Sequence, residues 1–134
     1  MGSYLNPGSK GFQESLNSEI YVDKTGLIEK TNAVLDTRQK FLCVSRPRRF
    51  GKSMAADMLA AYYERGEDAD LLFRSLKISK AESYRAHLNQ YDVIKVNIQE
   101  FLSMTGSMDE MLSMLKKYLV FDLMEHFDDV RFRD

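Results

Sequence analysis

Two runs of apolar residues predict buried β-strands. In the run at residues 40–45 the apolar side chains, from Phe41 to Val44, occupy consecutive positions and not alternate ones, which is typical of a parallel strand covered on both faces. Residues 91–100 are rich in β-branched side chains, with an expected core of Val93, Ile94, Val96 and Ile98. The segment between the two runs is long enough to contain helices. This length favours a right-handed crossover between parallel neighbours.

Apolar residues at helical spacing predict the elements around these strands. A helix is expected to follow residue 53 and to end near Gly66, because glycine favours the position after a helix. Shorter helical segments are expected near residues 12–16, 25–35, 71–76 and 83–87. A partial parallel sheet flanked by helices, and therefore an α/β fold, is the predicted architecture.

The last predicted helix carries a wide apolar stripe. Ser107 is expected to cap it, and Asp109 and Glu110 complement the dipole at its start. The stripe consists of Met108, Met111, Leu112, Leu115, Tyr118, Leu119, Leu123, Met124 and Phe127. A face turned to the core is favoured over a methionine-rich partner surface. Phe121 falls nearer the polar side and is a candidate exposed apolar contact.

Gly51-Lys52-Ser53 stands between the first apolar run and the helix after it, in the order that a phosphate-binding loop requires. In such a loop, backbone N–H groups surround the anion and the positive end of the following helix faces it. The lysine reaches the β- and γ-phosphates of a nucleotide, and the serine hydroxyl binds Mg²⁺. Glycine is needed at position 51 because the backbone passes close to phosphate. The pattern predicts a nucleotide site.

The match to the standard pattern, G-x-x-x-x-G-K-[ST], is incomplete. Arg46 takes the place of the first glycine, and Pro47 removes one possible N–H donor. Two alternatives stay open. The segment can be a basic surface turn between a strand and a helix. It can also be a module that binds a nucleic-acid backbone or a protein through the basic loop 46–52, although Phe50 is the only aromatic residue in this loop.

Three ordered motifs resemble the bacterial and archaeal AAA-ATPase-like family. Residues 45–53, Ser-Arg-Pro-Arg-Arg-Phe-Gly-Lys-Ser, resemble its phosphate loop, a variant Walker A motif in which arginine is usual at position 46. Residues 21–25, Tyr-Val-Asp-Lys-Thr, resemble its N-terminal signature, and residues 54–63 resemble its first helix. Members look like P-loop NTPases that bind ATP, and a restriction-endonuclease-like nuclease domain often follows. The resemblance covers most of the chain.

The loop pattern and the resemblance together single out seven residues for contact with the nucleotide phosphates: Arg48, Arg49, Phe50, Gly51, Lys52, Ser53 and Met54. Lys52 is expected to neutralise the terminal phosphates. Ser53 is expected to hold Mg²⁺, the implied cofactor, together with ATP. The two arginines can add charge-assisted hydrogen bonds to phosphate or can point to solvent.

Residues 21–25 have two interpretations. The resemblance implies a contribution to the pocket for the nucleotide base. The alternative, which we favour, is a strand and helix cap that pack against the core, with Asp23 or Thr25 as the cap. The helix that follows would then use Leu27, Ile28 and Leu35 as its apolar face.

A catalytic acid for ATP hydrolysis is missing from the pattern. Phosphoryl transfer needs an acidic residue at the end of a second strand to hold Mg²⁺. Glu100 is a weak stand-in, and members of the resembled family carry an Asp-Glu strand further downstream. We therefore interpret residues 1–134 as the N-terminal portion of a P-loop ATPase-like domain that binds ATP without hydrolysing it alone. The uncovered sheet edge of such a fragment predicts self-association.

Composition is that of an ordinary globular protein. The chain of 134 residues is 44% hydrophobic and 29% charged, with a net charge of −1, so no strong global field attracts nucleic acid or a membrane. A nucleic-acid partner is expected only through a separate domain.

Cys43 is the single cysteine and is expected to be buried, which favours a reducing cytoplasmic compartment. No secretory signal or membrane span is predicted. His87 and His126 lack neighbours at ligand spacing and are expected to be structural.

Overall fold

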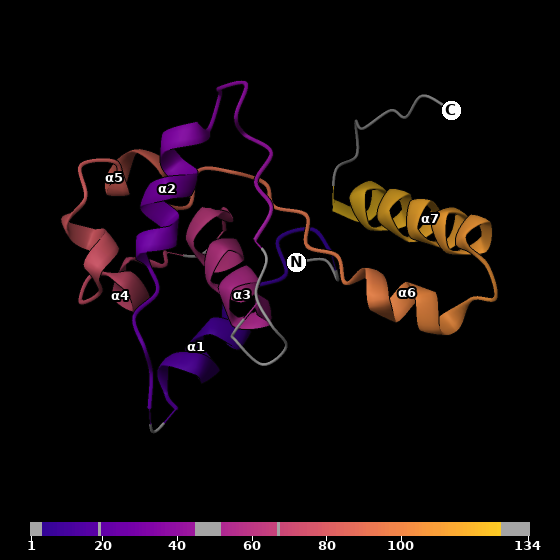
Figure 1. Ribbon diagram of the computed structural model, residues 1–134, viewed down its shortest axis with the longest axis horizontal. Coiled ribbons are helices and arrows are strands. Elements are labelled where there is room, and N and C mark those ends of the chain that lie inside the picture. The colour runs from indigo at the N-terminus through magenta and orange to yellow at the C-terminus, as the bar shows by residue number, and fades with distance from the viewer. Residues whose placement is uncertain (1–3, 19, 45–51, 67, 127–134) are drawn as a thin grey trace. The chain divides into compact units, whose positions relative to one another are not determined.

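The computed structural model describes residues 4–18, 20–44, 52–66 and 68–126 (Figure 1). The described residues form seven α-helices and one 3₁₀ helix. In chain order these are α1 (Lys10–Leu16), α2 (Gly26–Val34), α3 (Lys52–Tyr63), α4 (Asp70–Phe73), η1 (Lys77–Lys80), α5 (Tyr84–His87), α6 (Ile98–Met104) and α7 (Met108–His126). No helix within these ranges is long and apolar enough to span a membrane.

The predicted α/β fold with a parallel sheet is wrong for this part of the chain, which contains no strand. Backbone pairing is limited to two isolated bridges, an antiparallel one between Leu5 and Ile94 and a parallel one between Glu64 and Tyr91. Residues 40–44 pair with no described neighbour as a strand, and the side chain of Phe41 is 87% exposed. The single cysteine, Cys43, is exposed, so its predicted burial is also wrong.

The second predicted strand is interrupted by a helix. Asn97 precedes α6, and its side-chain Oδ1 accepts a hydrogen bond from the Gln99 amide at 3.0 Å. This N-cap satisfies a free amide of the first turn and outweighs the β-branched pattern of residues 93–98. Two of the expected core residues, Ile94 and Ile98, are consequently exposed.

The helices predicted from apolar spacing are largely confirmed. Phe12 is buried in α1, and Ile28 is buried in α2. The backbone of Gly66, three residues beyond α3, has a φ of +118°, a conformation that favours glycine. The Ser107 hydroxyl accepts a hydrogen bond from the Glu110 amide at 3.2 Å, as expected of a residue that caps α7. Helical spacing and helix caps involve residues that are close together in the chain, so they can be predicted from the sequence.

Contacts divide the chain into two compact units, Gly8–Asp92 and a second unit made of Met1–Pro7 with Val93–Asp134. The core of the first unit is aromatic. The Phe12 ring stacks on Phe73 with centroids 4.8 Å apart, and Tyr62 meets Phe73 edge to face at 5.6 Å. Residues in or next to five α-helices and the 3₁₀ helix η1 share one hydrophobic cluster: Phe12, Ile28, Met58, Ala61, Tyr62, Ala69, Phe73, Ile78, Tyr84 and Leu88.

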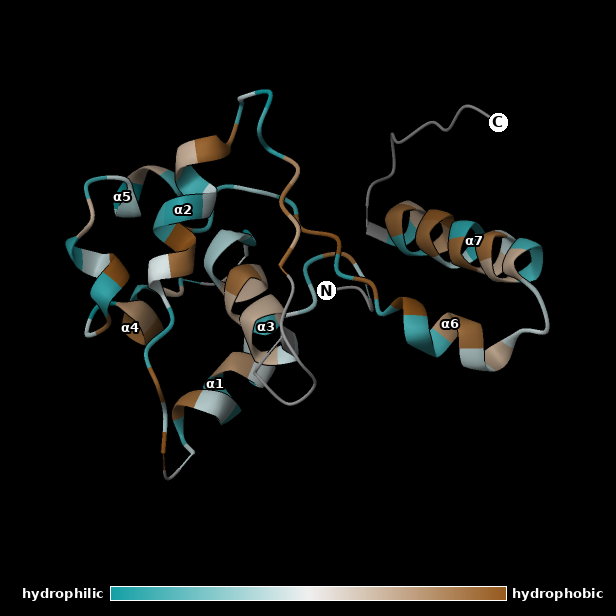
Figure 2. Ribbon diagram, in the orientation of Figure 1, coloured by the Kyte–Doolittle hydropathy of each residue, from teal (hydrophilic) through white to brown (hydrophobic). Residues whose placement is uncertain are grey.

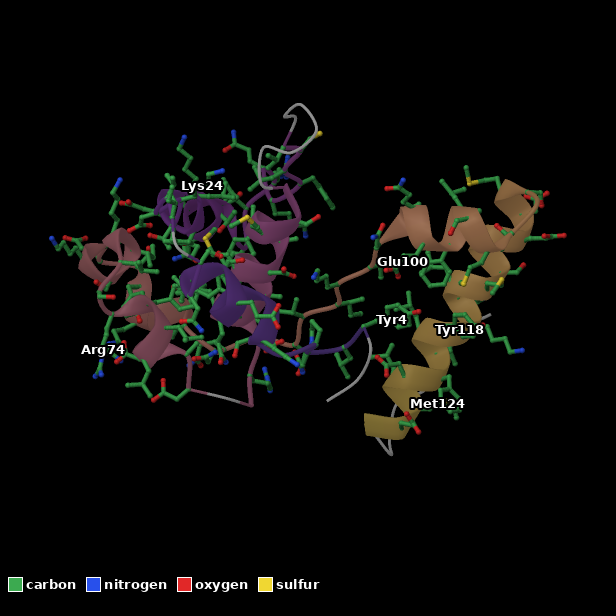
Figure 3. All side chains as sticks on the ribbon, turned by 90° about the horizontal axis from the view of Figure 1, so that it is seen from below. Tyr4, Lys24, Arg74, Glu100, Tyr118 and Met124 are labelled. Carbon is green, nitrogen blue, oxygen red and sulfur yellow. The ribbon has the colours of Figure 1, made fainter. Side chains whose placement is uncertain are left out.

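The second unit is held by α6, α7 and the segment at residues 4–6. The buried Asp122 side chain of α7 accepts hydrogen bonds from the backbone amides of Tyr4 and Leu5, at 3.0 and 2.8 Å. The Asn6 amide donates to the Val93 carbonyl at 2.7 Å, which extends the bridge between Leu5 and Ile94. Tyr4, Glu100 and Tyr118 lie near one another (Figure 3), and burial together with nearby acidic groups raises the pKa of Tyr4.

Candidate nucleotide-binding site

The start of α3 is the described part of the predicted phosphate site. The helix begins at Lys52, directly after residues 45–51, which lie outside the described residues together with the Lys52 side chain. Arg48, Arg49, Phe50 and Gly51 are therefore not placed. Ser53 and Met54 lie in the first turn, and both are exposed to solvent. The first turn of α3 contains no acidic residue, so no carboxylate on it opposes an anion at the positive end of the helix.

The C-terminal half of α3 is anchored in the core. Met58, Ala60, Ala61 and Tyr62 are all buried. Beyond the helix, the Asn89 side chain donates hydrogen bonds to the Ala61 and Glu64 carbonyls, at 3.3 and 2.7 Å. These bonds satisfy carbonyl groups that would otherwise lack partners at a helix end. The helix is thus fixed at its C-terminal end and open to solvent at its N-terminal end, as an anion-binding helix must be.

Helix α1 approaches α3 closely at one glycine. A Cβ atom at Gly11 would lie 2.8 Å from a carboxylate oxygen of Asp57. Such a distance is shorter than a real Cβ contact, so a side chain at this position would require the Asp57 carboxylate to shift. The Asp57 side chain lies half-buried against α1.

A network of hydrogen bonds ties α3 to α2 and α5. The Tyr62 hydroxyl donates to the Tyr84 carbonyl at 2.7 Å and accepts from the Asn32 side-chain nitrogen at 3.1 Å. The Tyr63 hydroxyl donates to the Asn32 side-chain oxygen at 2.6 Å. Burial raises the pKa of Tyr63 to about 12, so its hydroxyl remains a donor at neutral pH. Asn32 therefore fixes two adjacent tyrosines of α3.

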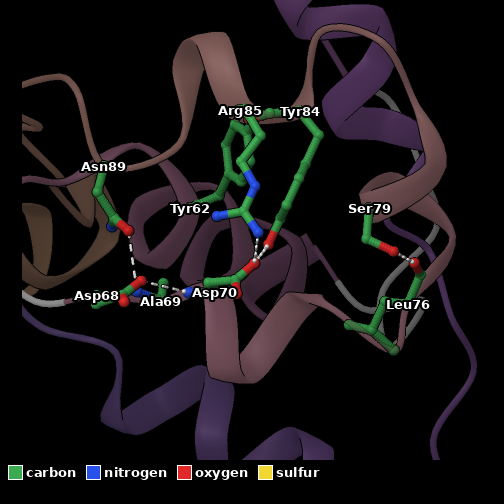
Figure 4. A network of polar contacts seen from close by, with 9 residues as sticks. All are labelled: Tyr62, Asp68, Ala69, Asp70, Leu76, Ser79, Tyr84, Arg85 and Asn89. Carbon is green, nitrogen blue, oxygen red and sulfur yellow. Dashed lines mark hydrogen bonds and ion pairs between the residues drawn. The ribbon is translucent and has the colours of Figure 1, made fainter.

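This network continues to the surface through Tyr84, as Figure 4 shows. The Tyr84 hydroxyl donates to Asp70 at 2.7 Å, and Arg85 forms an ion pair with the same carboxylate oxygen at 3.3 Å. Burial and the hydrogen bond to Asp70 raise the pKa of Tyr84. These contacts link α5 to α4.

Asn32 was not predicted to link α2 to α3. The signal in the sequence is the spacing: Asn32 comes one turn after Ile28 and therefore falls on the apolar face of α2. A polar residue on such a face is expected to be hydrogen-bonded. Its partners, Tyr62 and Tyr63, are about 30 positions away along the chain. No spacing pattern indicates contacts over such a separation.

Residues 21–25 pack against the rest of the first unit, as in the interpretation that we favoured, but residues 21–24 form no strand and the Thr25 side chain makes no capping hydrogen bond to α2. Asp23 accepts hydrogen bonds from the Thr25 amide at 2.9 Å and the Thr25 hydroxyl at 2.6 Å. The Thr25 hydroxyl in turn accepts from the Ile78 amide at 3.1 Å, and Thr25 is fully buried. Tyr21 packs edge to face on Phe12. This segment joins the start of α2 to η1.

Glu100 and His87 are two further residues that the sequence singled out for comment. Glu100 lies in the first turn of α6 and is exposed, instead of standing at the end of a strand. The His87 ring nitrogen Nδ1 and the Tyr91 hydroxyl are 2.6 Å apart, so His87 has a structural partner, as expected. Across the described ranges, no three His, Cys, Asp or Glu residues lie close enough together to bind a metal ion.

Comparison with known proteins gives one match. Residues 8–131 match a family model described as a predicted AAA-ATPase. The match includes all of α1 to α7 together with residues 45–51. No curated protein and no solved structure matches the chain.

Proposed function

The chain belongs to the predicted AAA-ATPase family, and we propose that it binds a nucleoside triphosphate through residues 48–54, with ATP as the preferred ligand. One observation carries the proposal. The family match contains Gly51-Lys52-Ser53, and α3 begins at Lys52, where a phosphate-binding loop requires a helix to begin. Lys52 would neutralise the terminal phosphates, and the amides of residues 49–53 would surround them. Arg48 and Arg49 would add charge-assisted hydrogen bonds.

Mg²⁺ would bind together with the nucleotide. Mg²⁺ prefers oxygen ligands and is usually held by one or two protein groups in addition to substrate phosphates. The exposed Ser53 hydroxyl on the first turn of α3 suits this role. The described residues contain no acidic cluster that could hold the ion alone, so the nucleotide phosphates would supply the other ligands. The bound ion would neutralise charge on the β- and γ-phosphates.

Binding, and not hydrolysis, is the activity proposed for residues 1–134. Phosphoryl transfer needs an acid to hold Mg²⁺ and a group to position the attacking water. The carboxylate nearest to this role in the sequence, Glu100, lies in α6 and belongs to the second compact unit. We therefore treat this chain as the nucleotide-binding portion of a larger ATPase-like domain.

We further propose that the chain self-associates through residues 41–44. Phe41, Leu42 and Val44 are exposed, and contiguous apolar side chains of this kind are usually covered in a stable protein. Sedimentation velocity over a range of concentrations tests this. The proposal predicts dimers or larger species in the wild type and a monomer when Phe41 and Val44 are replaced by Ser. A wild-type chain that is monomeric throughout would contradict it.

Displacement of a fluorescent ATP analogue tests the choice of ligand. Unlabelled ATP and inorganic tripolyphosphate should both displace the analogue, whereas a single-stranded oligonucleotide should not. If the loop binds a nucleic-acid backbone instead, the oligonucleotide should displace the analogue better than ATP or tripolyphosphate does. That alternative also predicts that Lys52→Ala loses only a fraction of the binding, because many phosphate contacts share the energy. A nucleotide site should lose nearly all of it.

A further inference from the structure

We draw no further inference here: the strongest candidate, the exposed apolar face of α7 (Figure 2) with Phe121 and Met124, carries nothing because no feature of the described residues shows what covers it.

Discussion

The Asp23 side chain accepts a hydrogen bond from the backbone amide of Lys77, and the two atoms are 2.8 Å apart. The residues are 54 positions apart in the sequence, and their bond joins the segment before α2 to the start of η1. The same carboxylate also binds the amide and hydroxyl of Thr25. The motif at residues 21–25 thus holds two distant segments together.

Asp23→Ala should destabilise the chain by about 1–2 kcal/mol, because three donors lose their acceptor at one site. Urea unfolding monitored by circular dichroism measures the change. Glu82→Ala, which removes an exposed carboxylate between η1 and α5, is the control and should have a much smaller effect. An equal effect of the two substitutions would show that the bonds made by Asp23 contribute little.

The stability should also depend on pH through Asp23. Burial alone would raise the pKa of this carboxyl group, but hydrogen bonds from the Thr25 hydroxyl and the Lys77 and Thr25 amides outweigh it and lower the pKa below its usual 3.8. A lowered pKa stabilises the folded state above the ordinary value, and this contribution is lost as the pH falls through the folded pKa. The difference in unfolding free energy between wild type and Asp23→Asn should therefore have its largest value at pH 6 and decrease as the pH falls below 3.8. A difference that stays constant down to pH 2 would contradict this linkage.

Tyr62→Phe should cost about 1–3 kcal/mol, because the Tyr84 carbonyl and the Asn32 side-chain nitrogen each lose one of their hydrogen bonds in a buried position. The measurement is again the free energy of unfolding in urea. Tyr118→Phe removes a hydroxyl from a residue that is partly exposed, and it should have a smaller effect. Comparable losses would mean that the network around Asn32 does not stabilise α3.

Asp122→Ala should loosen residues 4–6 without unfolding α7. The carboxylate binds the amides of Tyr4 and Leu5, so its removal leaves this segment with fewer bonds to the helix. Hydrogen exchange should become faster at the amides of Asn6 and Lys95, which bond across the same pairing. Glu125→Ala, an exposed position on the same helix, should leave both exchange rates unchanged. Unchanged protection in Asp122→Ala would contradict this role.

The sequence allowed the helices to be predicted better than the strands, for a physical reason. A helix satisfies its backbone groups locally, so apolar spacing and caps such as Ser107 are sufficient to locate α7. A strand needs a neighbour that is distant in the sequence, and an apolar run such as residues 40–45 does not show whether that neighbour is present. Residues 40–44 have no such neighbour within the described ranges, and Phe41 is exposed.

The candidate site was predicted from the loop pattern and from the family resemblance. The family is confirmed, and the first turn of α3 begins where the phosphate loop predicts a helix. The contacts of Arg48, Arg49, Phe50, Gly51 and Lys52 with a nucleotide stay predictions, since residues 45–51 and the Lys52 side chain lie outside the described part of the chain. Phe121, which was singled out by its position on the polar side of α7, is exposed as expected.

Calorimetric titration of the chain with ATP, with and without Mg²⁺, tests the central claim most directly. The wild type should bind ATP in the micromolar range more tightly with Mg²⁺ than without it, and Lys52→Ala should abolish the signal. Lys80→Ala, which removes an exposed positive charge from η1, should bind as the wild type does. ATP binding that Lys52→Ala leaves intact, or no binding by the wild type in the presence of Mg²⁺, would contradict a nucleotide site at residues 48–54.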